Sequence, residues 1–169
     1  MNLAVEHIGL AARNTVALKE WYVRILGARE VFNDGKSPPA FLLEIADRLM
    51  IEIYPADTSS DATGNNKLAG WRHLAIEVDS LESARAELAR RGVIFDEPIK
   101  PAGGGGRVLF FKDSEGNLLH LVERSEGSML ACQRHEGAVR PSGAAGVRSA
   151  TSAEAATTHS GKRTKSACP

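Results

Sequence analysis

An internal repeat constrains the fold of this chain more than any other feature of its sequence. In both halves, segments with strand-like and helix-like patterns follow one another in the order strand, helix, strand, strand, strand. The spacing also matches, since the interval from His7 to Asp47 equals the interval from His73 to Asp113. A chance succession of elements does not account for these matched offsets. The repeat therefore predicts an α+β fold made of two similar βαβββ modules.

Capping residues set the expected bounds of the first module. Asn14 is a typical helix N-cap and Gly27 a typical C-terminal stop, with apolar residues at helical spacing between them. These signals predict a helix over residues 15–26. Period-2 patterns and turn residues predict the four strands, which lie at 3–10, 28–34, 41–46 and 49–54, with a tight turn at Asp47 and Arg48 between the last two.

The second module begins after a linker, residues 56–70, that is rich in turn-forming residues. Ser80 caps the expected helix over 81–91, and Gly92 ends it. The strands are expected at 72–78, 93–97, 107–112 and 117–123. We accordingly expect modules at about 1–55 and 71–125, within one domain spanning residues 1–125.

Composition narrows the function classes. Lys plus Arg and Asp plus Glu number 21 each, so net charge gives no reason to expect nucleic acid or an anionic membrane as partner. No apolar run is long enough to span a bilayer, and the N-terminus lacks the pattern of a secretory signal. Both cysteines, Cys132 and Cys168, fall outside the repeat, which excludes a thiolate metal site there. We expect a cytoplasmic protein.

The segment 126–169 differs from the repeat in composition. It contains no aromatic residue and is dominated by Ala, Ser, Gly and Thr. Such a segment cannot bury enough apolar surface to offset its chain entropy. We expect a disordered C-terminal tail, whose role the sequence leaves open.

Four potential metal ligands lie on strands of the two modules. His7 and His73 lie on the first strands, and Glu52 and Glu123 lie on the last strands. Apolar residues flank each carboxylate on its own strand face, which makes an uncompensated charge there costly. Two imidazoles and two carboxylates suit a divalent transition metal, namely Ni, Zn, Co, Mn or Fe.

Each of these residues taken singly is more often structural than a ligand. Two pairs related by the repeat favour a metal site. His120 lies three residues before Glu123, so alternation along a strand predicts that it points away from the site. Glu44 is expected to be an exposed strand residue. The run 103–106 lacks the Lys-Ser/Thr of a phosphate loop and leads into a strand, so we expect a flap instead.

Three segments carry a resemblance to a known family. EHIGLAARNTVALKEWYVRILGA, RHLAIEVDSLESARAELARRGV and FFKDSEGNLLHLVE resemble the vicinal oxygen chelate superfamily, also called the glyoxalase/bleomycin resistance/dioxygenase family. The resemblance covers residues 3–124. It implies two βαβββ modules around a U-shaped cleft of mixed sheets, with a metal held at the positions of His7, Glu52, His73 and Glu123. It also implies a small-molecule substrate and a homodimer.

The ligand set resembles that of bacterial glyoxalase I, which implies a metal-dependent lyase or isomerase that transfers protons on a small oxygen-chelating substrate. Glu123 would remove a proton next to a carbonyl, and Glu52 would return it on the neighbouring carbon. The segment after Glu52 departs from the glyoxalase I pattern, and no glutathione-binding set is evident. An Fe(II)-dependent extradiol-type dioxygenase and a non-catalytic drug- or metabolite-binding protein of the bleomycin resistance type remain as alternatives.

Overall fold

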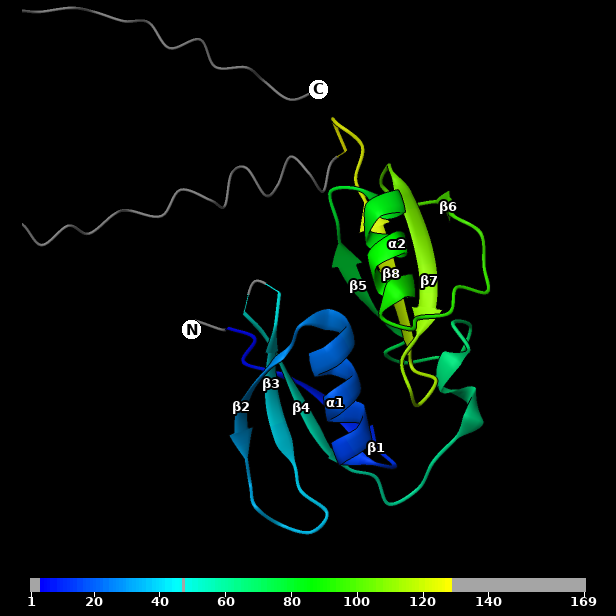
Figure 1. Ribbon diagram of the computed structural model, residues 1–169. Coiled ribbons are helices and arrows are strands. Elements are labelled where there is room, and N and C mark those ends of the chain that lie inside the picture. The colour runs from blue at the N-terminus through cyan, green and yellow to red at the C-terminus, as the bar shows by residue number, and fades with distance from the viewer. Residues whose placement is uncertain (1–3, 47, 129–169) are drawn as a thin grey trace, which may run out of the picture.

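The computed structural model describes residues 4–46 and 48–128, which form two four-stranded sheets, each with one α-helix (Figure 1). The first module contains one helix and four strands, which are β1 (Ile8–Ala12), α1 (Thr15–Leu26), β2 (Arg29–Asn33), β3 (Phe41–Ile45) and β4 (Leu49–Pro55). A short 3-10 helix, η1 (Asp61–Gly64), lies in the linker. The second module contains β5 (His73–Glu77), α2 (Leu81–Arg90), β6 (Lys100–Pro101), β7 (Arg107–Lys112) and β8 (Leu118–Glu123).

The two sheets have the same topology, which confirms the α+β fold with two βαβββ modules. Their strand orders are β1-β4-β3-β2 and β5-β8-β7-β6. In each sheet the first strand pairs in parallel with the last, and the last three strands are antiparallel. The first and the last strand of each module therefore lie side by side, although the helix and the other two strands separate them in sequence.

Both helices begin at the residues that the sequence predicts. The Asn14 side chain accepts a hydrogen bond from the backbone N–H of Ala17 at 3.0 Å. The Ser80 hydroxyl likewise accepts one from the backbone N–H of Ser83 at 3.2 Å. Gly27 follows α1 with φ of 71°, the left-handed conformation that favours glycine at a helix C-terminus. Local capping thus accounts for the helix bounds.

The expected strand over 93–97 is wrong. The second strand of the second module is instead β6, at Lys100–Pro101. The backbone N–H of Val93 bonds to Leu88 at 3.0 Å, so this residue still belongs to the end of α2, and its side chain is buried. Ile94 is 76% exposed. The apolar run that resembles a strand is therefore split between the core and the surface. Asp47 and the segment 129–169 lie outside the described residues.

Each sheet has one side that bears its helix and one side that is open. On the helix-bearing side of the first sheet, Leu43 and Ile53 are fully buried against α1 residues such as Leu18. On the corresponding side of the second sheet, Leu109 and Leu121 are buried and are paired across β7 and β8. Residues of opposite parity face the open sides.

The two modules pack through their helix-bearing sides. Trp21 of α1 stacks on Phe111 of β7, with ring centroids 6.5 Å apart, and both belong to one continuous hydrophobic core. Glu115 in the β7–β8 turn accepts hydrogen bonds from the backbone of Arg13 and Asn14. Helix α1 thus contacts the helix-bearing sides of both sheets, so both open faces point away from it.

Candidate metal centre

His7 and Glu52 meet on the open face of the first sheet. In the parallel pairing of β1 with β4, Gly9 lies opposite Glu52, and His7 lies one residue before β1, which starts later than the expected strand over 3–10. The Nε2 atom of His7 lies 3.5 Å from the Oε2 atom of Glu52. Two ligands that are each about 2.1 Å from a tetrahedral metal lie about 3.4 Å apart. The spacing of this pair therefore fits joint coordination of one ion.

The other ring nitrogen of His7 is already engaged. Its Nδ1 atom hydrogen-bonds to the Glu6 carboxylate, and this bond raises the pKa of His7. Carboxylates commonly orient metal-binding histidines in this way and leave Nε2 for the metal. The absence of a side chain at Gly9 leaves room for the Tyr54 ring beside the pair. A Cβ atom at this position would lie 3.2 Å from that ring, which is a tight contact.

His73 and His120 form the corresponding pair on the open face of the second sheet. Ala75 lies opposite His120 in the pairing of β5 with β8, and His73 shares the parity of Ala75. The two imidazole centroids are 4.6 Å apart. The Nδ1 atom of His73 lies 2.9 Å from the side-chain oxygen of Asn66 in the linker, an arrangement that leaves Nε2 for a ligand.

His120 carries the signs of an unsatisfied ligand. Its Nδ1 atom is buried and has no hydrogen-bond partner in the described part of the chain. Burial lowers the pKa of His120 to about 4, and positive charge on His73 and Arg124 contributes to the shift. The imidazole is therefore neutral at neutral pH and retains the lone pair that metal coordination requires. The expectation that His120 points away from the site is wrong.

Glu123 lies on the opposite side of its sheet, and the expectation that it joins the two histidines is corrected. It shares parity with the buried Leu121 and faces the start of α2, where its carboxylate accepts the backbone N–H of Leu81 at 2.8 Å. Arg107 donates to both of its oxygens, at 2.7 and 2.8 Å. The bond from Leu81, together with Arg107, lowers the pKa of Glu123. Here the carboxylate is compensated by the helix N-terminus and a guanidinium.

The register explains why His120 takes the position first assigned to Glu123. Glu52 lies opposite Gly9, two residues after His7, and His120 lies opposite Ala75, two residues after His73. Counting strand parity backward from the buried leucines of β8 could have identified this position. The longer turn at 113–117 obscured it, because matching the module ends does not match the strand registers.

The two pairs do not meet within one chain. Among the described residues, no three His, Cys, Asp or Glu side chains lie close enough together to hold one metal ion. The packing of α1 against both sheets accounts for this, since the open faces that carry the pairs point away from it. Three imidazoles and one carboxylate nevertheless form a suitable donor set for a divalent transition metal.

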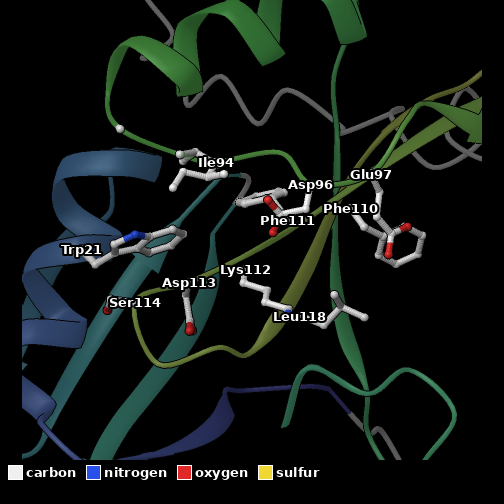
Figure 2. A pocket seen from close by; sticks show the side chains of 12 residues that line it. Trp21, Ile94, Asp96, Glu97, Phe110, Phe111, Lys112, Asp113, Ser114 and Leu118 are labelled. Atoms are coloured by element: carbon white, nitrogen blue, oxygen red, sulfur yellow. The ribbon is translucent and has the colours of Figure 1, made fainter. Parts of the chain in front are cut away.

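One pocket has no histidine in its lining. It has a volume of about 350 Å³ and lies between α1, the segment after α2 and β7, with Trp21, Phe111, Asp96 and Lys112 among its lining residues (Figure 2). The Asp113 carboxylate at its edge accepts hydrogen bonds from Asn117 and Glu115 within the β7–β8 turn. Asp113, the most buried acidic residue of this pocket, thus stabilises the β7–β8 turn.

Fold and donor pairs define a two-module protein of the vicinal oxygen chelate class. Residues 4–121 match the Glyoxalase/Bleomycin resistance protein/Dioxygenase superfamily, and the chain belongs to this superfamily. Its members are often metal-dependent enzymes and bind small molecules. No helix in the described ranges is long and apolar enough to cross a membrane.

Individual relatives agree with this assignment. The chain is 27% identical over 123 residues to the uncharacterized protein YaeR of Escherichia coli, covering 71% of this chain and 95% of that protein. A glyoxalase family protein from Enterococcus faecalis is 27% identical, with a TM-score of 0.62. The match covers 71% of this chain and 97% of that protein. The fosfomycin resistance protein FosX from Listeria monocytogenes, solved with Mn(II) and 1S,2S-dihydroxypropylphosphonic acid, is 20% identical with a TM-score of 0.58, covering 79% and 99%. At 20% identity, the similarity to FosX supports a shared fold and nothing further.

Proposed function

We propose that this protein is a metal-dependent lyase or isomerase of the glyoxalase type that acts on a small oxygen-chelating substrate. A divalent metal would be held by His7 and Glu52 of one copy and by His73 and His120 of a second copy. The observation that carries the proposal is the buried Nδ1 atom of His120, which has no hydrogen-bond partner among residues 4–46 and 48–128 and lies beside His73, at the register position that corresponds to Glu52. Cytoplasmic localisation remains part of the proposal.

A homodimer would complete the site. Each open face carries two of the four donors, and large apolar side chains are exposed on the first of these faces and just before β5. Phe32, on the same face as Glu52, is 53% exposed, and Trp71, just before β5, is 88% exposed. Exposed apolar side chains around half of a polar site favour burial against another surface. A second copy is the occupant that supplies the missing donors, so the first sheet of one copy and the second sheet of the other would enclose the cleft.

Glu52 is the base of the proposed reaction, because it is the one carboxylate in the proposed donor set. A bound divalent metal supplies Lewis acidity to the substrate oxygens. Glu52 removes a proton next to the carbonyl and returns it on the neighbouring carbon. His7 and His73 keep their geometry through Glu6 and Asn66. Glu123 takes no part in proton transfer, because its oxygens are bound by Leu81 and Arg107.

An Fe(II)-dependent dioxygenase of the extradiol type is the second candidate, and one observation favours it. A donor set with a single carboxylate contains the two-His-one-carboxylate arrangement of non-haem iron oxygenases, formed here by His7, His73 and Glu52. A binding protein without turnover, of the bleomycin resistance type, is the candidate outside enzymes.

Metal analysis followed by reconstitution tests the proposal. Purified full-length protein would be stripped and reloaded with Ni(II), Co(II), Mn(II), Zn(II) or Fe(II), and solvent deuterium exchange into 2-oxoaldehyde hemithioacetals and 2-hydroxy ketones would be followed by NMR. Exchange with redox-inert ions supports proton transfer, and Glu52→Gln should abolish it. Glu44→Gln, on the same face but paired with Arg29, is the matched control. Oxygen consumption with a catechol and iron alone would instead indicate the dioxygenase, and binding without metal or turnover the binding protein.

A further inference from the structure

We propose that Arg124 and the hollow beside His120 bind a carboxylate carried on a short apolar chain, which would form the end of the substrate remote from the metal. This inference names a substrate class for the proposed metal site and rests on that site for its catalytic meaning. The binding itself depends on residues of the second module alone, and so it can be tested without a metal.

The hollow lies on the open face of the second sheet. It has a volume of about 310 Å³, close to the lower end of the range for ligand pockets, about 300 Å³. Its walls include the apolar side chains of Val108, Phe110 and Val122. They also include His120 and Arg124. The Phe110 ring also meets the His120 ring edge to face, at 4.8 Å. An apolar chain placed here would therefore lie directly beside a proposed metal ligand.

Arg124 is held at the edge of this hollow by the β6–β7 turn. Its Nη1 atom donates to the backbone oxygens of Gly103 and Gly105, at 2.7 and 3.0 Å. Neither bond neutralises the guanidinium, and within the described residues Arg124 has no carboxylate partner. Five N–H donors are available on a guanidinium, so the donors of Nε and Nη2 remain for a ligand. The turn thus fixes a cation whose donors are only partly used.

Guanidinium chemistry identifies the ligand class. A carboxylate accepts two parallel hydrogen bonds from an arginine, and such charge-assisted bonds are stronger beside apolar walls than in water. Arg124 directly follows β8 and has the same parity as His120. The two residues are four positions apart, so their Cα atoms are separated by about 13 Å. The long arginine side chain and a short substrate chain can bridge this distance together.

Binding of matched probes to the metal-free full-length protein tests the proposal. Hexanoate and hexanamide have the same chain and differ in charge, and their affinities can be measured by NMR titration. We expect hexanoate to bind about tenfold more tightly than hexanamide, as expected for one charge-assisted pair. Arg124→Gln should remove this preference while leaving hexanamide affinity within about twofold, and Arg124→Lys should retain part of it.

Arg90→Gln is the matched control, because Arg90 lies on the exposed face of α2 and pairs with Glu87. It should leave the preference unchanged, and amide spectra of each variant would show that the fold is intact. Equal binding of hexanoate and hexanamide, retention of the preference in Arg124→Gln, or equally tight binding of inorganic phosphate would overturn the proposal. Because no metal is present, these results are independent of whether the metal proposal holds.

Discussion

His120 and Glu123 lie three residues apart on β8, yet their surroundings differ completely. His120 is partly buried on the open face, with a nitrogen that no described residue satisfies. Glu123 lies on the helix-bearing side, where a helix N-terminus and Arg107 surround it. A buried polar atom without a partner is costly, whereas a carboxylate with three donors is stable. This contrast is the reason for proposing His120 as a metal ligand, whereas the contacts of Glu123 give it a structural role.

Substituting His120 separates these roles. We expect His120→Ala to weaken Ni(II) binding by at least about tenfold, because one of four donors is lost. Isothermal titration of stripped protein measures the change. Glu123→Gln serves as the control and should keep the affinity within about twofold. Loss of affinity in Glu123→Gln with none in His120→Ala would return the ligand role to Glu123.

Glu123 should instead affect stability in a pH-dependent way. Its pKa is lowered in the folded state by the bond from Leu81 and by Arg107, so the unfolded state binds the proton more readily. The stabilisation is present above the ordinary carboxyl pKa and is lost as pH falls through the folded pKa. We expect Glu123→Gln to lower Tm at pH 7, and the difference from the unsubstituted protein to shrink toward pH 3. A difference that is independent of pH would contradict this role.

At the scale of elements, Gly106 occupies a crowded position in the β6–β7 turn. Gly106 has φ of 102°, and a Cβ atom there would lie 2.1 Å from the backbone oxygen of Glu123. Gly106→Ala should therefore destabilise the fold by at least about 2 kcal/mol, from backbone strain and overpacking. Gly103→Ala, in the same turn but with open space at its Cβ position, should have little effect. Chemical denaturation measures both, and similar stabilities would contradict this reading of the turn.

The helices and strands also differ in how well the sequence predicts them. Helix α1 was predictable in full because Asn14 and Gly27 mark both ends with local chemistry. The strand expected at 93–97 failed because burial of Val93 under α2 is a tertiary contact that no local pattern reports. The repeat led to His7, Glu52 and His73 as candidate ligands. It did not lead to His120, because the register of β8 depends on the longer turn that joins it to β7.

At the scale of the whole molecule, duplication and packing determine where a site can form. Each module contributes one pair of donors to an open face. Trp21 lies against Phe111, so α1 contacts the helix-bearing sides of both sheets. Within the described residues, the two pairs of candidate donors are therefore separate, as the proposed site between two copies requires. Under two-fold symmetry, two copies would form two complete sites, each with halves from different chains.

Mixing two variants that each lack one donor tests whether the metal site is shared between two copies. His7→Ala removes a donor from the first module, and His73→Ala removes one from the second. After subunit exchange, half of the dimers contain both variants, and in these one site has both substitutions while the other has none. We expect the mixture to bind Ni(II) with unsubstituted affinity at about a quarter of the sites, although neither variant does so alone. A mixture that binds no more metal than the separate variants would contradict a site shared between two copies.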